Sequence, residues 1–170
     1  ADKIIAVSQQ TKKDIIRFFN VDQRKIEVVY QGCNTIFQNQ LPNNYKNEII
    51  AKHQLASKYL LYVGTIEERK NLLTVLKCLK ELPDYDLVVI GTGGKYKQKC
   101  LSYIKKNKLT SQITFLSKLN LKEMAAIYQN AELMIYPSFF EGFGIPILEA
   151  LFSEIPVITT LGGAFSEAGG

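Results

Sequence analysis

The chain has 170 residues, of which 46% are apolar and 22% charged, and its formal net charge is +5. This composition is typical of a globular protein with one hydrophobic core and part of a second. No apolar run approaches the ~20 residues that a membrane-spanning helix needs, and the first residues lack the character of a signal peptide.

Three cysteines, Cys33, Cys78 and Cys100, are odd in number and widely spaced. They lack the close pairing of zinc sites and redox motifs, so we interpret them as buried free thiols in a reducing compartment. The one histidine, His53, cannot supply a metal cluster. We therefore expect a cytoplasmic protein with no metal site.

The first part of the chain predicts a small α/β unit. Residues 3–7 and 25–30 are typical of strands, and Ser8 is a candidate N-cap for a helix that ends near residue 19. From residue 38 to 44 the composition changes to Asn, Gln and Pro, which indicates a linker. The abrupt start of the chain and its Gly-Gly finish suggest a piece of a longer protein.

Beyond residue 45, short apolar runs alternate with amphipathic helices. The expected strands are 59–63, 85–90, 113–116, 132–137 and 156–159, and the expected helices are 45–53, 71–82, 95–108, 122–130 and 146–152. This alternation predicts an α/β fold, a Rossmann-like parallel sheet with helices on both faces. In such sheets ligands bind beyond the carboxyl ends of the strands, where glycines cluster in this sequence.

Helix 95–108 is rich in lysine. Its apolar residues follow helical spacing, so we expect the lysines to occupy its solvent face. Peripheral contact with the inner face of a membrane is the alternative. No basic and aromatic platform accompanies the charge, and we expect no nucleic-acid binding.

Arg69 and Lys70 follow the expected strand 59–63 and precede a helix for which Asn71 is the candidate cap. Cations at this place face a ligand at the sheet edge, and Arg can bind a phosphate through two parallel hydrogen bonds. The alternative is surface pairing with Glu67 or Glu68.

The segment from residue 141 to 149 combines a glycine turn with a helix start. Gly142 and Gly144 allow a tight turn, and the amides of residues 143–145 are expected to point outward, where a phosphate is favoured. Pro146 suits the first helical turn because its missing amide is not needed there.

Two carboxylates border this turn. Glu149 is one turn into the helix, where a carboxylate would repel phosphate, so we interpret it as an acceptor for vicinal hydroxyls such as those of ribose. Glu141 precedes the turn and is expected on the other side of a diphosphate, near a sugar. The alternative is that Glu149 caps a loop and Glu141 is merely exposed.

Together these segments resemble the retaining glycosyltransferases of the two-Rossmann-domain GT-B type, group 1 or family 4. The family signature is a Glu, seven residues and a second Glu, as in Glu141 to Glu149. Segments 6–14, 28–34, 62–71 and 162–167 also fit, in order and at family-like spacing, so the resemblance covers nearly the whole chain.

The resemblance implies roles for individual residues. Arg69 and Lys70 would hold the diphosphate of a nucleotide-sugar donor, Glu149 its ribose, and Glu141 would lie near the donor sugar. The other implied donor-binding residues are Gly64, Thr65, Ser117, Leu119, Gly142, Phe143, Gly144 and Ile145. Thr65 stands where many members have Arg, and Ser117 where a glycine is common.

It also implies an activity: transfer of a hexose, with retention and without a metal or cofactor, to a glycan or lipid-linked acceptor in surface polysaccharide synthesis. Residues 1–37 match the end of the acceptor-binding domain, and residues 45–170 an incomplete donor-binding domain. We therefore expect this piece to bind donor without transferring sugar.

Three alternatives remain open. Gly91-Thr-Gly93-Gly94 begins like a dinucleotide fingerprint, but Tyr96 stands where its third glycine belongs, which argues against an oxidoreductase. A sugar-nucleotide epimerase and a non-catalytic nucleotide-sugar-binding subunit share the expected fold.

Overall fold

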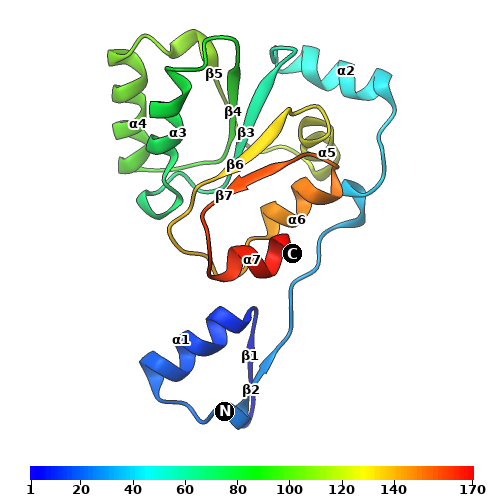
Figure 1. Ribbon diagram of the computed structural model, residues 1–170. Coiled ribbons are helices and arrows are strands. Elements are labelled where there is room, and N and C mark those ends of the chain that lie inside the picture. The colour runs from blue at the N-terminus through cyan, green and yellow to red at the C-terminus, as the bar shows by residue number, and fades with distance from the viewer.

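The computed structural model describes residues 1–170, which form a small unit and a larger α/β domain (Figure 1). The small unit consists of β1 (Ile4–Ala6), α1 (Gln9–Phe19) and β2 (Ile26–Val28), with the two strands paired in parallel. Ser8 caps α1 as expected, because its side chain accepts a hydrogen bond from the amide of Thr11.

An extended segment joins the two units. Phe37, at the end of a short 3-10 helix, is fully buried in the core of the larger domain, where its ring meets that of Tyr128 edge-on at 5.2 Å. Helix α2 (Asn43–Lys52) begins directly after Pro42, inside the range expected to be a linker. Apolar packing in the larger domain therefore starts before that range.

The larger domain is built on five parallel strands in the order β5-β4-β3-β6-β7. Their bounds are β3 (Tyr59–Val63), β4 (Asp86–Ile90), β5 (Ile113–Leu116), β6 (Leu133–Tyr136) and β7 (Val157–Thr159). The predicted Rossmann-like parallel sheet is confirmed. The chain moves outward from β3 to β5 and then returns to the other side of β3, so the strand order reverses between β3 and β6.

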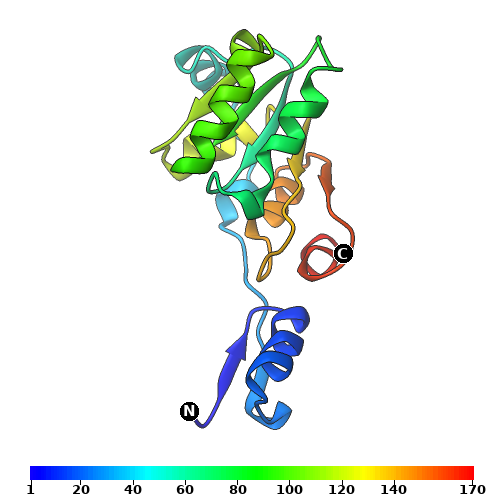
Figure 2. The ribbon, with the colours of Figure 1, turned by 90° about the vertical axis from the view of Figure 1, so that its left-hand side faces the viewer.

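Helices cover both faces of this sheet (Figures 1 and 2). On one face α3 (Leu72–Leu79) and α4 (Lys95–Lys106) pack with Leu60 and Tyr62 in a core of 12 buried residues. On the other face α2, α5 (Leu121–Tyr128), α6 (Ile145–Phe152) and α7 (Ala164–Gly169) pack with Leu61 and Val63 in a core of 21 buried residues. Alternate residues of β3 thus enter opposite cores, which explains its continuous apolar sequence.

Most lysines of α4 and the turn after it are exposed, as predicted: Lys95, Lys99, Lys105, Lys106 and Lys108. The expectation of three buried thiols is wrong for two of them: Cys100 is buried, but Cys33 is half-buried and Cys78 is exposed on α3. No helix has both the length and the apolar character needed to cross a membrane.

Candidate functional site

The loops after β3 and β6 meet at the point where the strand order reverses. Two contacts tie them together: the Asn71 side chain donates to the carbonyl of Pro137, and the amide of Phe139 donates to the carbonyl of Arg69. Asn71 occupies the N-cap position of α3 in a left-handed conformation, but its side chain accepts no hydrogen bond from the helix amides. The expected capping bond to a helix amide is therefore absent, and the side-chain oxygen of Asn71 instead accepts from the hydroxyl of Thr74.

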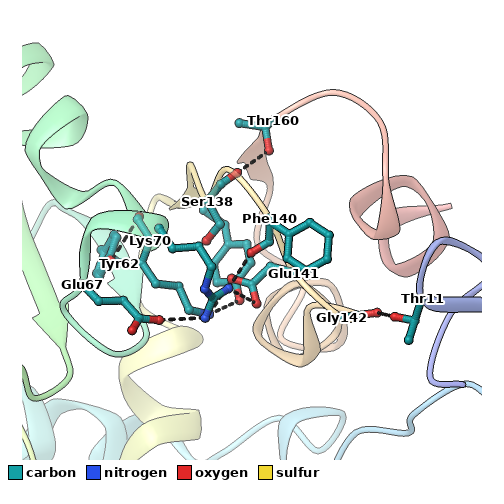
Figure 3. A network of polar contacts seen from close by, with 11 residues as sticks. Thr11, Tyr62, Glu67, Lys70, Ser138, Phe140, Glu141, Gly142 and Thr160 are labelled. Carbon is teal, nitrogen blue, oxygen red and sulfur yellow. Dashed lines mark hydrogen bonds and ion pairs between the residues drawn. The ribbon is translucent and has the colours of Figure 1, made fainter. Parts of the chain in front are cut away.

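Arg69, Lys70 and Glu141 come together at this junction, and Figure 3 shows Lys70 and Glu141 within the network of polar contacts there. Lys70 Nζ lies 2.5 Å from Glu141 Oε1, and Arg69 Nη1 lies 3.0 Å from Glu141 Oε2. Arg69 also pairs with Glu67 at 2.7 Å, so the surface pairing considered from the sequence occurs alongside the contact with Glu141. The lysine and Glu141 are buried, whereas the arginine side chain is 40% exposed.

Burial alone would raise the pKa of Glu141, but the paired Lys70 ammonium and Arg69 guanidinium outweigh it. The pKa of this carboxyl is therefore below its ordinary value, and Glu141 is an anion at neutral pH. Lys70 is fixed further by Tyr136, whose hydroxyl lies 2.9 Å from Nζ. This arrangement suits electrostatic stabilisation of a bound anion better than acid–base exchange within the cluster.

The turn before α6 supplies three free amides. The amides of Phe143, Gly144 and Ile145 donate to no other group in the structure. Gly144 is the N-cap of α6 with φ +108°, a conformation that favours glycine. Together with Lys70 and Glu141 this turn lines a hollow of about 290 Å³. The combination of free amides, a helix start and a cation is suited to a phosphate group.

Glu149 lies apart from this cluster. It is on α6 and does not line the same hollow, and its Oε2 accepts a hydrogen bond of 2.7 Å from the hydroxyl of Tyr128 on α5. Burial raises the pKa of Glu149, and the Tyr128 hydrogen bond opposes that rise. It is thus neither a loop cap nor in contact with Glu141.

The remaining predicted residues fall at two places. Gly64 adopts φ +143° at the end of β3 and lies beside the Lys70 side chain, whereas Thr65 is exposed. Ser117 is exposed and Leu119 is half-buried. Both follow β5, the edge strand that β4 and β3 separate from β6. No contact joins these two residues to the Arg69, Lys70 and Glu141 cluster, and their role in holding a base stays a prediction.

Contacts from the small unit also reach the site, and the sequence did not indicate them. The Thr11 hydroxyl donates to the carbonyl of Gly142 at 3.0 Å, and Glu167 accepts from the amides of Gln9 and Gln10 at the start of α1. The ring of Tyr30 stacks on Phe143 at 5.6 Å. Of these contacts, only the pairing of a carboxylate with the first amides of a helix is a pattern that recurs in proteins. Glu167 is more than 150 residues away from the start of α1, so the sequence does not reveal that the two meet.

The glycines of the segment from Gly91 to Gly94 have a packing role. A Cβ atom on Gly91 would lie 2.0 Å from the carbonyl oxygen of Gly64, and one on Gly93 would lie 2.4 Å from that of Ile66. The close approach of two backbones therefore explains these glycines without a dinucleotide.

No group of three or more His, Cys, Asp or Glu side chains is arranged to hold a metal ion.

The model of the protein family described as "Glycosyl transferases group 1" matches residues 45–168 of the chain. The chain belongs to this family. O-antigen chain mannosyltransferase B from Escherichia coli is 31% identical over 164 residues, which cover 93% of this chain and 43% of that protein. O-antigen chain mannosyltransferase RfbU from Salmonella typhimurium is 31% identical over 158 residues, covering 92% of this chain and 41% of the relative. The chain thus spans less than half the length of these relatives.

Solved structures share the fold of this group 1 chain. HepE from Anabaena, crystallised with UDP and glucose, superposes with a TM-score of 0.88 at 18% identity, over 98% of this chain and 46% of its own. WaaG, a glycosyltransferase involved in lipopolysaccharide biosynthesis, gives a TM-score of 0.82 at 20% identity, over 98% and 46% of the two chains. The fold is therefore that of GT-B glycosyltransferases.

Proposed function

We propose that these residues form the donor-binding half of a retaining hexosyltransferase that takes its sugar from a nucleotide-diphosphate sugar. The acceptor of the full-length protein would be a glycan or a lipid-linked glycan in surface polysaccharide synthesis, in line with the O-antigen mannosyltransferases to which the chain is similar. We also propose that the full-length enzyme acts in the cytoplasm, in peripheral contact with the inner face of the membrane.

The observation that carries the proposal is that Lys70 shares a hollow with three free amides at the reversal of the strand order, with Arg69 paired to Glu141 beside it. Lys70 and the start of α6 line a hollow of about 290 Å³, and Arg69 contacts Glu141, which lines the same hollow. A diphosphate would replace Glu141 as the partner of at least one cation, and Glu141 would then be free to contact hydroxyls of the donor sugar. Glu149 would accept hydrogen bonds from the ribose.

In the proposed reaction the bond between the anomeric carbon and the diphosphate oxygen breaks, and its electron pair leaves with the diphosphate. The acceptor hydroxyl bonds to the same face of that carbon, and its proton passes to the departing phosphate. Arg69, Lys70 and the amides of residues 143–145 stabilise the charge that develops on the leaving group. These groups supply the charge stabilisation that a metal ion gives elsewhere, so we propose a reaction that does not depend on a metal.

Calorimetric titration of the chain with ADP, GDP, UDP and their sugar conjugates tests donor binding. We expect one nucleotide family to bind, and Glu149→Ala to weaken it about tenfold or more through lost bonds to a charged acceptor. Glu48→Ala, on the exposed face of α2, is the matched control and should bind as the wild type does.

Preference for NAD over every sugar nucleotide would contradict the proposal. Binding that Glu149→Ala leaves unchanged would contradict the assignment of Glu149. Conversion of the bound donor into its epimer would favour the epimerase alternative, and binding without transfer by the full-length protein would favour a non-catalytic subunit.

A further inference from the structure

The carboxylate of Glu149 is held by one residue that no sequence motif connects with the site. Tyr128 is the last residue of α5, its side chain is fully buried, and its hydroxyl donates to Glu149 Oε2 at 2.7 Å. This is the one hydrogen bond that the hydroxyl makes. A buried phenol hydroxyl normally requires a partner, and here that partner is the carboxylate implied in ribose binding.

The two oxygens of Glu149 differ in their surroundings. Oε2 is occupied by Tyr128, whereas Oε1 accepts no hydrogen bond in the structure and is not among the fully buried unpaired oxygens. One oxygen is thus fixed by the protein and the other retains access to solvent. A carboxylate anchored in this way presents its second oxygen in a defined direction.

The ring of Tyr128 is held independently of its hydroxyl. It meets Phe37 edge-on at 5.2 Å and belongs to the larger of the two cores. Replacement by Phe would therefore keep the packing and remove only the hydrogen bond to Glu149.

We propose that Tyr128 is a positioning residue: its hydroxyl orients the Glu149 carboxylate so that Oε1 accepts hydrogen bonds from the vicinal hydroxyls of the donor's ribose. This inference rests on the proposed function, in which Glu149 binds the ribose. Tyr128 itself does not touch the nucleotide.

The test compares ligands that differ only in those hydroxyls. The probes are the nucleoside diphosphate that binds most tightly among ADP, GDP and UDP, its 2′,3′-dideoxy counterpart, and inorganic pyrophosphate. We expect Tyr128→Phe to weaken the ribonucleotide about fivefold, the worth of one well-placed hydrogen bond. The affinities for the dideoxy compound and for pyrophosphate should stay at the wild-type values.

Tyr59→Phe is the matched control, because it also removes one buried hydroxyl, which donates to the carbonyl of Ile127 on the same helix α5. It should leave all three affinities unchanged. If Tyr128→Phe binds the ribonucleotide like the wild type, or weakens the dideoxy compound equally, the positioning role is wrong.

Glu149→Gln separates this inference from the proposed function. If Glu149→Gln weakens the ribonucleotide selectively but Tyr128→Phe does not, only the role of Tyr128 is overturned. If Glu149→Gln has no selective effect, or no nucleotide binds, the proposed function fails and the inference fails with it.

Discussion

At the scale of single residues, the site is organised by one buried anion between two cations. The sequence identified Arg69, Lys70 and Glu141 as site residues because each follows a strand and the strands were expected to be parallel. It did not show that they pair with one another, since Glu67 and Glu68 were nearer partners in the chain. Pairing across 71 residues depends on β3 and β6 being neighbours, which no local pattern encodes.

Removal of Lys70 should expose the cost of this buried charge. Lys70→Met leaves Glu141 buried with only the partly exposed Arg69 as a cationic partner, and we expect a loss of about 2 kcal/mol in the free energy of unfolding at neutral pH. The pKa of Glu141 is lowered in the folded state, so its contribution is present above the ordinary carboxyl pKa and is lost as the pH falls through the lowered value. Urea unfolding at several pH values measures both effects.

The double variant Lys70→Met, Glu141→Gln is the control, because it leaves no unpaired charge in the cluster. It should recover part of the stability at neutral pH. An equal loss at all pH values, with no recovery in the double variant, would show that the ion pair is not the cause.

At the scale of elements, periodicity predicted every strand of the large sheet and the helices α2 to α6. The ends were less accurate: α3 ends at Leu79, before the Leu82-Pro83 turn, and not at residue 82. Helix α7 was not predicted, because six residues between glycines carry no helical period. It is stabilised by tertiary packing, since Ala164, Phe165 and Ala168 are buried.

The glycine at the start of α6 is expected to be important for both stability and anion binding. Gly144→Ala places a Cβ at φ +108° and 3.2 Å from Ile147 Cδ1, so we expect a loss of about 1–3 kcal/mol in stability and weaker binding of pyrophosphate. Gly169→Ala is the control, since it adds the same methyl in α7 at an ordinary contact distance of 3.9 Å. Thermal unfolding and calorimetry would contradict the prediction if the two variants behaved alike.

At the scale of the whole molecule, the proposed function makes these residues one side of a two-sided active site. The proteins it matches are more than twice as long, and the matched family region lies in residues 45–168. From the sequence, the family resemblance implied that this part is the donor side, which stays a proposal. It could not identify the base, the sugar or the acceptor, because those choices depend on a few hydroxyl contacts rather than on the fold.

We therefore expect residues 1–170 alone to bind the donor without transferring its sugar. Incubation with donor and lipid-linked acceptor, followed by measurement of released nucleoside diphosphate, checks this. The full-length protein should release it under the same conditions. Steady release above the level of the Lys70→Met variant by residues 1–170 would contradict the expectation.

The hydrogen bond from Thr11 to the carbonyl of Gly142 has a thermodynamic consequence. Thr11 of the small unit thus binds the turn before α6, and the amides of residues 143–145 in that turn are proposed to bind phosphate. Glu167 of the larger domain binds the small unit at the start of α1. Docking of the small unit and occupation of the turn are then coupled equilibria. By reciprocity, a donor that tightens the docking by some factor is itself bound more tightly by that factor when the small unit is docked.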